Sequence, residues 1–396
     1  MSEANIPTCI HLAVITETWP PEVNGVAHTI HHLVQGLRKL NRYQLELVRP
    51  RQFAAEQAQV QEGFTEYLTK GVTLPFYKEV NIGLPQYWAL KKRWTQHRPD
   101  IVQIVTEGPL GYSAMRAAKS LGIPVFSDFH TNFDQYSRHY HLKYAFRFAG
   151  AYLRHLHNQT LCTLVPTHEL LHQLFEAGYR SLGILERGID AELFHPAKRS
   201  HALRTSLGIS DEQLLVVLVS RMAQEKNLDL AFSSFRQIQQ VVPNARFLLV
   251  GDGPERERLE AEHPDCLFVG MQVGQALAEH YASGDLFLYP STSETFGNVI
   301  IEAMASGLPV LTYDYAAAHK YIQSGHNGVA VPFDDEVAFH KAAIALAQDT
   351  PQARQLMGSL ARETAQELSW ESVVNRLDNI INDLLTEVYH EASTPT

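Results

Sequence analysis

The sequence predicts an α/β protein made of two doubly wound, parallel-sheet domains. A chain of 396 residues is longer than one hydrophobic core usually serves, so two domains are expected. Short strands that are apolar on consecutive positions alternate with segments of helical spacing, as in parallel sheets covered on both faces. This succession restarts once, after a polar stretch at residues 194–205 that we interpret as a linker. We therefore predict an N-terminal domain at 1–195 and a C-terminal domain at 196–396, facing a cleft where the carboxyl ends of strands bind ligands.

The predicted strands follow in order along the chain. Those of the N-terminal domain are residues 10–16, 43–49, 100–106, 123–129 and 160–166, and those of the C-terminal domain are residues 214–220, 245–251, 266–270, 285–291, 308–314 and 328–332. The helices between them repeat apolar residues at helical spacing, for example at 26–40 and 228–242. The last helix, at about residues 369–389, is long and amphipathic, and it can pack back on the N-terminal domain.

Composition restricts the class of protein. The chain is 45% hydrophobic and 19% charged, as ordinary globular proteins are, and no apolar run approaches the roughly 20 residues that span a bilayer. The first residues lack the basic region of a signal peptide. The three cysteines are far apart, each within or beside an apolar run, which indicates reduced core thiols. We therefore expect a cytoplasmic protein.

The net charge of −10 is unevenly distributed along the chain. Residues 1–195 carry +2 and 13 of the 20 histidines, whereas the remaining residues carry −12. An acidic half argues against nucleic acid as a partner. If one half contacts an anionic surface, it should be the first.

Two glutamates mark the segment PSTSETFGNVIIEAMASGLPV, residues 290–310. Glu294 lies in the loop after a predicted strand, and Glu302 lies one to two turns into the following predicted helix. Eight helical residues rise about 12 Å, less if the loop curls back, whereas paired glycosidase carboxylates lie about 5–9.5 Å apart. The spacing favours two contacts to one long ligand over an acid/base pair. From spacing alone, a surface glutamate and an unrelated helix-face glutamate fit equally well.

Three backbone amides stand between the two glutamates, those of Phe296, Gly297 and Asn298. At a predicted helix N-terminus, such amides have no intrahelical acceptor and bind phosphate or hydroxyl oxygens. A carboxylate at each end with amides between them suits a nucleotide sugar.

Motifs along nearly the whole chain resemble those of one enzyme family. They are TETWPPEVNGVAHTI, IPVFSDFHTNF and RGIDAELFHP in the first half, and SRMAQEKNLDL, GDGPERERLE, GMQVGQALAEHYASGDLFLYPS and SETFGNVIIEAMASGLPVL in the second. The last closely resembles the Glu-x7-Glu signature of retaining glycosyltransferases of the GT-B fold. This large family of group 1 glycosyltransferases includes sucrose synthases and bacterial mannosyltransferases. The resemblance implies two Rossmann-like domains, the N-terminal one for the acceptor and the C-terminal one for the nucleotide-sugar donor.

The resemblance implies roles for four side chains of the C-terminal domain. Glu294 would hold the hydroxyls of the donor hexose, and Glu302 would hold the ribose. Arg221 and Lys226 would bind the diphosphate and stabilise the charge on the leaving nucleotide, because fixed cations aimed at developing charge lower the barrier. As a lone pair in sequence, Arg221 and Lys226 could equally be solvated surface cations.

Two residues of the N-terminal domain belong to the same implied site. Gly25 would let the backbone approach the diphosphate, and His130 would lie beside the transferred sugar and the acceptor. Taken singly, Gly25 could be only a turn and His130 a structural histidine. The implied catalytic set is His130 with Arg221, Lys226 and Glu294.

The resemblance also implies a mechanism without a metal. The family reading is displacement on one face of the sugar, with retention, in which the leaving phosphate helps to deprotonate the acceptor. The chain has no Asp-x-Asp motif, and Arg with Lys can replace a divalent ion, so we expect neither a metal nor a cofactor. Residues 313–319 depart from the family's Gly-Gly-small pattern, which leaves both UDP-glucose and GDP-mannose open as donors.

The acceptor prediction depends on aromatic and basic residues of the first half. In 133–154, the aromatic residues recur at four-residue intervals beside basic ones: Tyr136, Tyr140, Tyr144, Phe148 and Tyr152, with Arg138, Lys143, Arg147 and Arg154. A second segment contains Trp88, Lys91, Lys92, Arg93 and Trp94. Such residues suit the lipid headgroup layer, although the stripe in 133–154 fits a domain core equally well.

We therefore predict a peripheral enzyme on the inner face of the plasma membrane that glycosylates a lipid such as diacylglycerol. Mannosyl transfer from GDP-mannose to phosphatidylinositol or to a soluble glycan is the alternative. An epimerase or phosphorylase of the same fold is a further one, since a fold does not fix a function.

One motif indicates a different class of protein. HELLH, with His168, Glu169 and His172, fits the His-Glu-x-x-His pattern of zinc metalloproteases, in which two imidazoles on one helix face bind the metal. A third ligand at a recognised spacing is missing, and histidine is abundant in this chain. We therefore rank a metalloprotease far below a glycosyltransferase.

Overall fold

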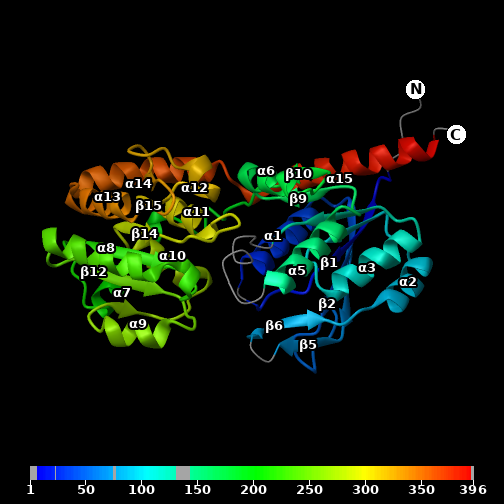
Figure 1. The fold of residues 1–396 in the computed structure, drawn as a ribbon, viewed down its shortest axis with the longest axis horizontal. Coiled ribbons are helices and arrows are strands. Elements are labelled where there is room, and N and C mark those ends of the chain that lie inside the picture. Colours follow the sequence, from blue (N-terminus) through cyan, green and yellow to red (C-terminus); the bar gives the residue numbers. More distant parts are fainter. Residues whose placement is uncertain (1–6, 23, 75–76, 131–142, 394–396) are drawn as a thin grey trace. The chain divides into compact units, whose positions relative to one another are not determined.

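The computed structural model describes residues 7–22, 24–74, 77–130 and 143–393. The chain forms two compact units, one comprising Met1–Gly188 with Trp370–Thr396 and the other Ile189–Ser369 (Figure 1). It therefore passes from one unit to the other twice, whereas the sequence analysis placed a single boundary after residue 195.

The first unit is built on a parallel sheet in the order β10-β9-β8-β7-β1-β2-β4-β3, in which only the pair β3–β4 is antiparallel. Its strands are β1 (Ile10–Ile15), β2 (Tyr43–Pro50), β3 (Val60–Gln61), β4 (Phe64–Thr69), β7 (Ile101–Ile104), β8 (Val125–Asp128), β9 (Thr163–Val165) and β10 (Leu182–Ile184). A separate hairpin comprises β5 (Gly71–Leu74) and β6 (Tyr77–Gly83). The helices are α1 (Gly25–Lys39), α2 (Tyr87–Gln96), α3 (Pro109–Ser120), α5 (Lys143–His157), α6 (His168–Glu176) and α15 (Trp370–Ser393).

The second unit is built on a fully parallel sheet in the order β13-β12-β11-β14-β15-β16. Its strands are β11 (Leu215–Val219), β12 (Arg246–Val250), β13 (Leu267–Phe268), β14 (Leu286–Tyr289), β15 (Val310–Tyr313) and β16 (Val329–Val331). Its helices are η1 (Pro196–Lys198), α7 (His201–Ser206), η2 (Gln224–Lys226), α8 (Leu228–Val241), α9 (Arg256–Glu262), α10 (Gly274–Ala282), α11 (Asn298–Ala305), α12 (Ala316–Tyr321), α13 (Glu336–Gln348) and α14 (Pro351–Gln366). The predicted α/β class with two parallel sheets is confirmed.

Each central strand contributes to two cores, which explains why its residues are apolar on consecutive positions. In β11, Leu215, Val217 and Val219 pack into one cluster. The alternate residues Val216 and Leu218 pack into the other cluster, on the opposite face of the sheet. A strand covered by helices on both faces has no solvent-facing side, so both sets of side chains are apolar.

The last helix, α15, belongs to the first unit and packs along α1 (Figure 1, red). The two helices approach closely at Gly36, where an added Cβ would lie 2.2 Å from Cγ2 of Val374. Asp378 of α15 pairs with Arg42 at 3.3 Å and accepts a hydrogen bond from the Tyr43 hydroxyl. The amphipathic pattern of the sequence thus corresponds to a helix whose apolar face is buried.

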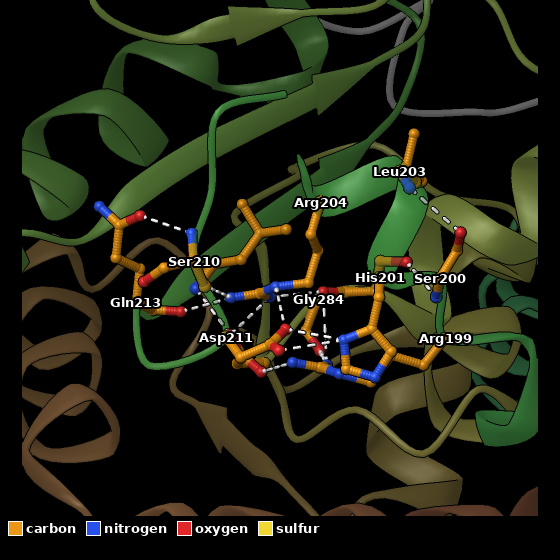
Figure 2. A network of polar contacts seen from close by, with 12 residues as sticks. Arg199, Ser200, His201, Leu203, Arg204, Ser210, Asp211, Gln213 and Gly284 are labelled. Carbon is orange, nitrogen blue, oxygen red and sulfur yellow. Dashed lines mark hydrogen bonds and ion pairs between the residues drawn. The ribbon is translucent and has the colours of Figure 1, made fainter. Parts of the chain in front are cut away.

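The polar stretch that we interpreted as a linker is an ordered part of the second unit (Figure 2). Arg204 of α7 is only 1% exposed, and its guanidinium donates to the carbonyl oxygens of Ser210, Gln213 and Ser283. It also pairs with Asp285, the residue before β14, at 3.2 Å. The sequence pattern misses this because an arginine reads as solvent-exposed unless its buried acceptors are known.

The cysteines differ in burial. Cys266 is buried and Cys162 is partly buried, as expected of core thiols. Cys9 is exposed, so the expectation of a core position is wrong for this residue. Among the residues that the structure describes, no helix is both long enough and apolar enough to cross a membrane.

Candidate active site

Arg221 and Lys226 lie in the loop that follows β11 in the second unit. The Nζ atom of Lys226 forms an ion pair with Oε1 of Glu294 and donates to the carbonyl oxygen of Ser293 at 3.2 Å. The Arg221 side chain is 53% exposed and pairs with Glu225 of its own loop. The structure therefore brings Lys226 to Glu294 and leaves Arg221 at the surface.

Three donors converge on one oxygen of Glu294, which follows β14. Besides Lys226, the hydroxyls of Ser291 and Tyr289 donate to Oε1, that of Ser291 at 2.8 Å. Tyr289 is buried, and burial together with the charge of Glu294 raises its pKa well above the ordinary value. Tyr289 therefore remains protonated and keeps donating. These contacts fix the carboxylate at the carboxyl end of its strand.

Glu302 lies in α11 and has a different environment. Its Oε2 accepts a hydrogen bond of 2.9 Å from the hydroxyl of Tyr281, a fully buried residue of α10. Burial raises the pKa of Glu302 to about 7, and the Tyr281 hydroxyl offsets part of that increase. Glu302 is thus a carboxyl group that one tyrosine orients and that water solvates poorly.

The turn before α11 has the backbone geometry of an anion site. Gly297 is the N-cap residue and has φ +98°, a left-handed conformation that favours glycine. Within the described part of the chain, the amides of Phe296, Gly297 and Asn298 donate no hydrogen bond. The side chain of Phe296 is buried in the core, so only its amide can serve a ligand.

Residues 313–319, which depart from the family's Gly-Gly-small pattern, also differ in backbone conformation from an ordinary loop. Ala316 adopts φ +53° at the start of α12, a conformation that glycine adopts at lower cost. The next amide, that of Ala317, donates to the carbonyl oxygen of Phe296 at 2.8 Å. This loop therefore supports the turn that precedes α11.

Gly25 is the first residue of α1 in the first unit and is exposed. The preceding Asn24 caps the helix, because its Oδ1 accepts from the amides of Val26 at 3.1 Å and Ala27 at 2.8 Å. This N-terminus therefore has a side-chain cap of its own, unlike that of α11.

His130 lies just after β8 in the first unit, with 13% of its side chain exposed. Its Nε2 lies 3.8 Å from Oδ2 of the buried Asp128. Its Nδ1 lies 3.4 Å from a guanidinium nitrogen of Arg187, which is also buried. His130 thus stands between a carboxylate and a cation.

The basic and aromatic segment on α2 divides into two parts. Trp88 is 77% exposed and Lys92 is exposed, while Lys91 contacts the ring of Tyr87. In contrast, Trp94 is fully buried, and both its indole N–H and the Arg93 guanidinium bind Glu46. Trp94 is therefore unavailable to a membrane, and Arg93, with 31% of its side chain exposed, has a structural partner.

The other aromatic and basic segment, residues 133–154, lies partly outside the described residues. Tyr136, Arg138 and Tyr140 are among those outside. The structure also gives no side-chain description for Lys143, Tyr144, Arg147 and Phe148. Tyr152 is 37% exposed and donates to the carbonyl oxygen of Glu107, and Arg154 donates to that of Ala177. The prediction of a continuous stripe stays a prediction.

The HELLH motif forms the start of α6. His168, Glu169 and His172 are exposed, and Glu169 accepts a hydrogen bond from Gln173. In the described ranges, no three or more His, Cys, Asp or Glu side chains are arranged to hold a metal ion. The geometry gives the metalloprotease hypothesis no support.

Sequence reasoning missed the residues that orient the predicted ones. Tyr281, Tyr289 and Ser291 lie inside the quoted motifs, but neither spacing nor charge indicates that they contact the two glutamates. Arg187 lies in the quoted motif RGIDAELFHP, where only its distance in sequence from His130 hides the contact.

Comparison with known proteins agrees with these motifs. The family described as Glycosyltransferase Family 4 matches residues 23–193, and the family described as Glycosyl transferases group 1 matches residues 213–349. A GDP-mannose-dependent alpha-mannosyltransferase of Corynebacterium glutamicum is 31% identical over 371 residues, which cover 93% of this chain and 87% of the relative. An alpha-monoglucosyldiacylglycerol synthase of Acholeplasma laidlawii is 24% identical over 360 residues, covering 84% and 87%.

Solved structures support the same fold. The sucrose-phosphate synthase of Thermosynechococcus elongatus superimposes with a TM-score of 0.78, at 17% identity, over 96% of this chain and 100% of that one. At this identity the likeness concerns the fold alone. Together with the family matches, it shows that the chain belongs to the group 1 glycosyltransferases and has their GT-B fold.

Proposed function

We propose that the protein is a retaining hexosyltransferase that moves a hexose from a nucleotide sugar to a hydroxyl of a membrane lipid such as diacylglycerol. One observation carries the transfer reaction. At the strand ends of the second unit, a lysine-bound carboxylate and a tyrosine-bound carboxyl flank three amides that make no hydrogen bond among the described residues. A nucleotide sugar has hydroxyls at both ends and phosphates between them, which matches this order of groups.

The negative charge that forms on the leaving nucleotide explains the role of the two cations, Lys226 and Arg221. Breaking the bond between the sugar and the diphosphate leaves negative charge on the nucleotide, and a preorganised cation lowers that barrier. Lys226, held by Glu294 and a backbone carbonyl, is the better preorganised of the two cations. Arg221 is exposed and must leave Glu225 to reach the same phosphate. No carboxylate base is needed if the leaving phosphate takes the acceptor's proton.

The two glutamates should have separable roles. Glu302→Ala should weaken the binding of free nucleotide as well as of the sugar nucleotide, whereas Glu294→Ala should chiefly lower kcat. Calorimetric titration with nucleotide, alongside steady-state kinetics, separates these effects. Glu257→Ala, an exposed glutamate of α9, is the matched control. If both variants reduce only kcat and nucleotide affinity is intact, the pair acts chemically and our assignment is wrong.

We also propose that transfer needs no metal ion, because Lys226 and Arg221 supply the positive charge. Activity should persist in an excess of EDTA. Loss of activity that added Mg²⁺ or Mn²⁺ restores would contradict this.

A lipid acceptor is supported by the surface of α2. Trp88 is 77% exposed with Lys92 nearby on the same helix, and large exposed aromatics beside cations suit the headgroup layer. One relative is named for a glucosyldiacylglycerol product. On this basis we propose peripheral association with the inner face of the plasma membrane.

The membrane experiment should spare the structural residues of α2. In a double variant, Trp88→Ser with Lys92→Glu should reduce cosedimentation with phosphatidylglycerol vesicles and transfer to diacylglycerol, while nucleotide binding stays unchanged. Arg93 is left intact because it holds Glu46. The matched control is Phe175→Ser with Arg180→Glu, an exposed apolar residue and an exposed cation elsewhere in the first unit. If the wild type ignores vesicles and glycosylates a soluble sugar, the lipid assignment is wrong.

Mannosyl transfer is the second candidate, and the identity to a GDP-mannose-dependent mannosyltransferase supports it. The acceptor could then be phosphatidylinositol or a soluble glycan. A screen of UDP-glucose and GDP-mannose, each with and without lipid vesicles, separates the candidates by acceptor-dependent release of nucleotide. Turnover of the sugar nucleotide without any acceptor would indicate an epimerase instead.

A further inference from the structure

Arg187 joins two residues that the sequence assigned to the site in the first unit. It follows β10, and the residue is only 6% exposed. One terminal nitrogen lies 3.5 Å from the carbonyl oxygen of Gly25, at the start of α1. The other lies 3.4 Å from Nδ1 of His130. Arg187 therefore ties the imidazole to the loop after β1.

This contact determines where the imidazole carries its hydrogen. A guanidinium N–H can only donate, so the Nδ1 atom that faces it must offer a lone pair. A hydrogen on Nδ1 would set two donors against each other. The His130 ring then has its hydrogen on Nε2, the tautomer that a hydrogen bond to the other nitrogen selects.

The opposite side of the ring faces an acceptor. Nε2 lies 3.8 Å from Oδ2 of Asp128, which Gln103 holds through a hydrogen bond of 2.7 Å. The second oxygen, Oδ1, is buried, and within the described residues it has no hydrogen-bond partner. Asp128, His130 and Arg187 line one pocket together with Thr29 and Glu186. A hydroxyl that enters this pocket would find an N–H donor and a carboxylate acceptor.

We propose that Arg187 is a positioning residue that holds His130 as a neutral hydrogen-bond donor through Nε2. His130 then donates to an oxygen of the sugar or the acceptor and does not take a proton from it. Asp128 accepts from the hydroxyl bound beside it. The identity of that substrate rests on the proposed function, whereas the tautomer of His130 depends only on the protein.

The tautomer can be read by NMR of protein labelled with 15N at histidine, with His130→Gln to identify the resonances. In the wild type, Nε2 should show the shift of a protonated nitrogen and Nδ1 that of an unprotonated one. Because Asp128 still faces Nε2, Arg187→Met should admit a minority of rings with the hydrogen on Nδ1, seen as a shift of both nitrogen resonances toward each other, and should lower kcat by about tenfold, the value of one charge-assisted hydrogen bond. The affinity for free nucleotide should not change. Arg180→Met, at an exposed position of the same unit, should alter none of these quantities.

Arg187→Lys keeps a cation and a donor, so it should retain the Nε2–H tautomer and most of kcat, and it serves as the readout if Arg187→Met does not fold. A wild-type His130 protonated on Nδ1 would overturn the proposal. So would an unchanged tautomer in Arg187→Met, or a loss of nucleotide affinity, which would make Arg187 a phosphate ligand instead. If the wild type transfers no hexose from any donor, the proposed function fails while the tautomer is still measured.

Discussion

The two units share a parallel sheet architecture, yet they hold their strand-end residues differently. In the second unit, Glu294 receives three donors at one oxygen, and Glu302 receives a hydroxyl from a fully buried tyrosine. In the first unit, His130 stands 3.4 Å from a cation and 3.8 Å from a carboxylate. The short contacts indicate a preformed cluster of polar side chains in the second unit. The longer contacts in the first unit leave room for a ligand group to replace one of them.

The largest expected effect tests the preformed site. Lys226→Ala should cost about 2–4 kcal/mol of transition-state stabilisation, the range for removing one preorganised donor. Arg221→Ala should cost less, because Arg221 is half exposed and pairs with Glu225 in the unbound protein. The measurement is kcat/KM for the nucleotide sugar, with Arg258→Ala, an exposed arginine of α9, as control. Equal losses of kcat/KM in Lys226→Ala and Arg258→Ala would show that Lys226 has no special role in stabilising the transition state.

Each unit also contains one carboxyl whose pKa burial raises to about 7, Glu17 in the first and Glu302 in the second. Since the folded pKa exceeds the unfolded one, the folded state binds the proton more tightly. The resulting stability is fully present below about pH 4.5 and is lost as the pH rises through 7, up to about 3 kcal/mol for each group. Glu17→Gln and Glu302→Gln should each abolish this pH-dependent loss of stability in the unit that carries the substitution.

Urea unfolding at pH 5 and pH 8 measures the effect. Relative to the wild type, each Gln variant should gain stability on going from pH 5 to pH 8. Asp265→Asn provides a control without pH dependence in this range, because the Arg236 guanidinium lowers the pKa of that exposed carboxyl and it stays ionised in both states at pH 5 and pH 8. If neither variant changes the pH dependence, water solvates both carboxyls and burial does not raise their pKa values.

A third effect concerns the first unit alone, through the contact between α1 and α15. Gly36→Ala would put Cβ 2.2 Å from Val374. The net destabilisation should be roughly 1–2 kcal/mol, because overpacking costs about 1–3 and alanine returns up to about 1 through helix propensity. The double variant of Gly36→Ala with Val374→Ala should lose this destabilisation, because the contacting methyl groups are removed. Gly150→Ala, where an added Cβ meets nothing within 4 Å, should raise the unfolding temperature instead.

The smallest effect of a substitution is the loss of one helix cap, and it belongs to a contrast between the two helix N-termini. Asn24→Ala removes the cap of α1 and should lower the stability of the first unit by about 1 kcal/mol. Since α11 has no side-chain cap, bound nucleotide should stabilise the second unit, by about 2.7 kcal/mol at one hundred times Kd. Thermal unfolding with and without nucleotide checks both. A nucleotide shift that Asn24→Ala abolishes would place the anion on α1 instead.

The sequence predicted the second unit more completely than the first. All six predicted strands of the C-terminal half exist, because each packs apolar side chains on both faces of the sheet and is therefore apolar on consecutive positions. In the first half, β4 was missed because two threonines and a glutamate interrupt the apolar residues of FTEYLT, and β10 because three residues give no periodicity. The amphipathic pattern of α15 predicted a helix with one buried face, but the unit on which that face packs, and hence the second crossing at Ser369, depends on the tertiary structure.

For the predicted site, residue type and spacing in the sequence indicated two glutamates and a glycine turn between them, and the family resemblance added two cations and a histidine at strand ends. Only the tertiary structure decided which of these are held and by what. Tyr281, Tyr289, Ser291 and Arg187 act through contacts with residues 21, 5, 3 and 57 positions away. Parallel sheets bring the ends of distant strands together, so the partner of a charged group depends on strand order. A pattern along the chain carries no record of that order.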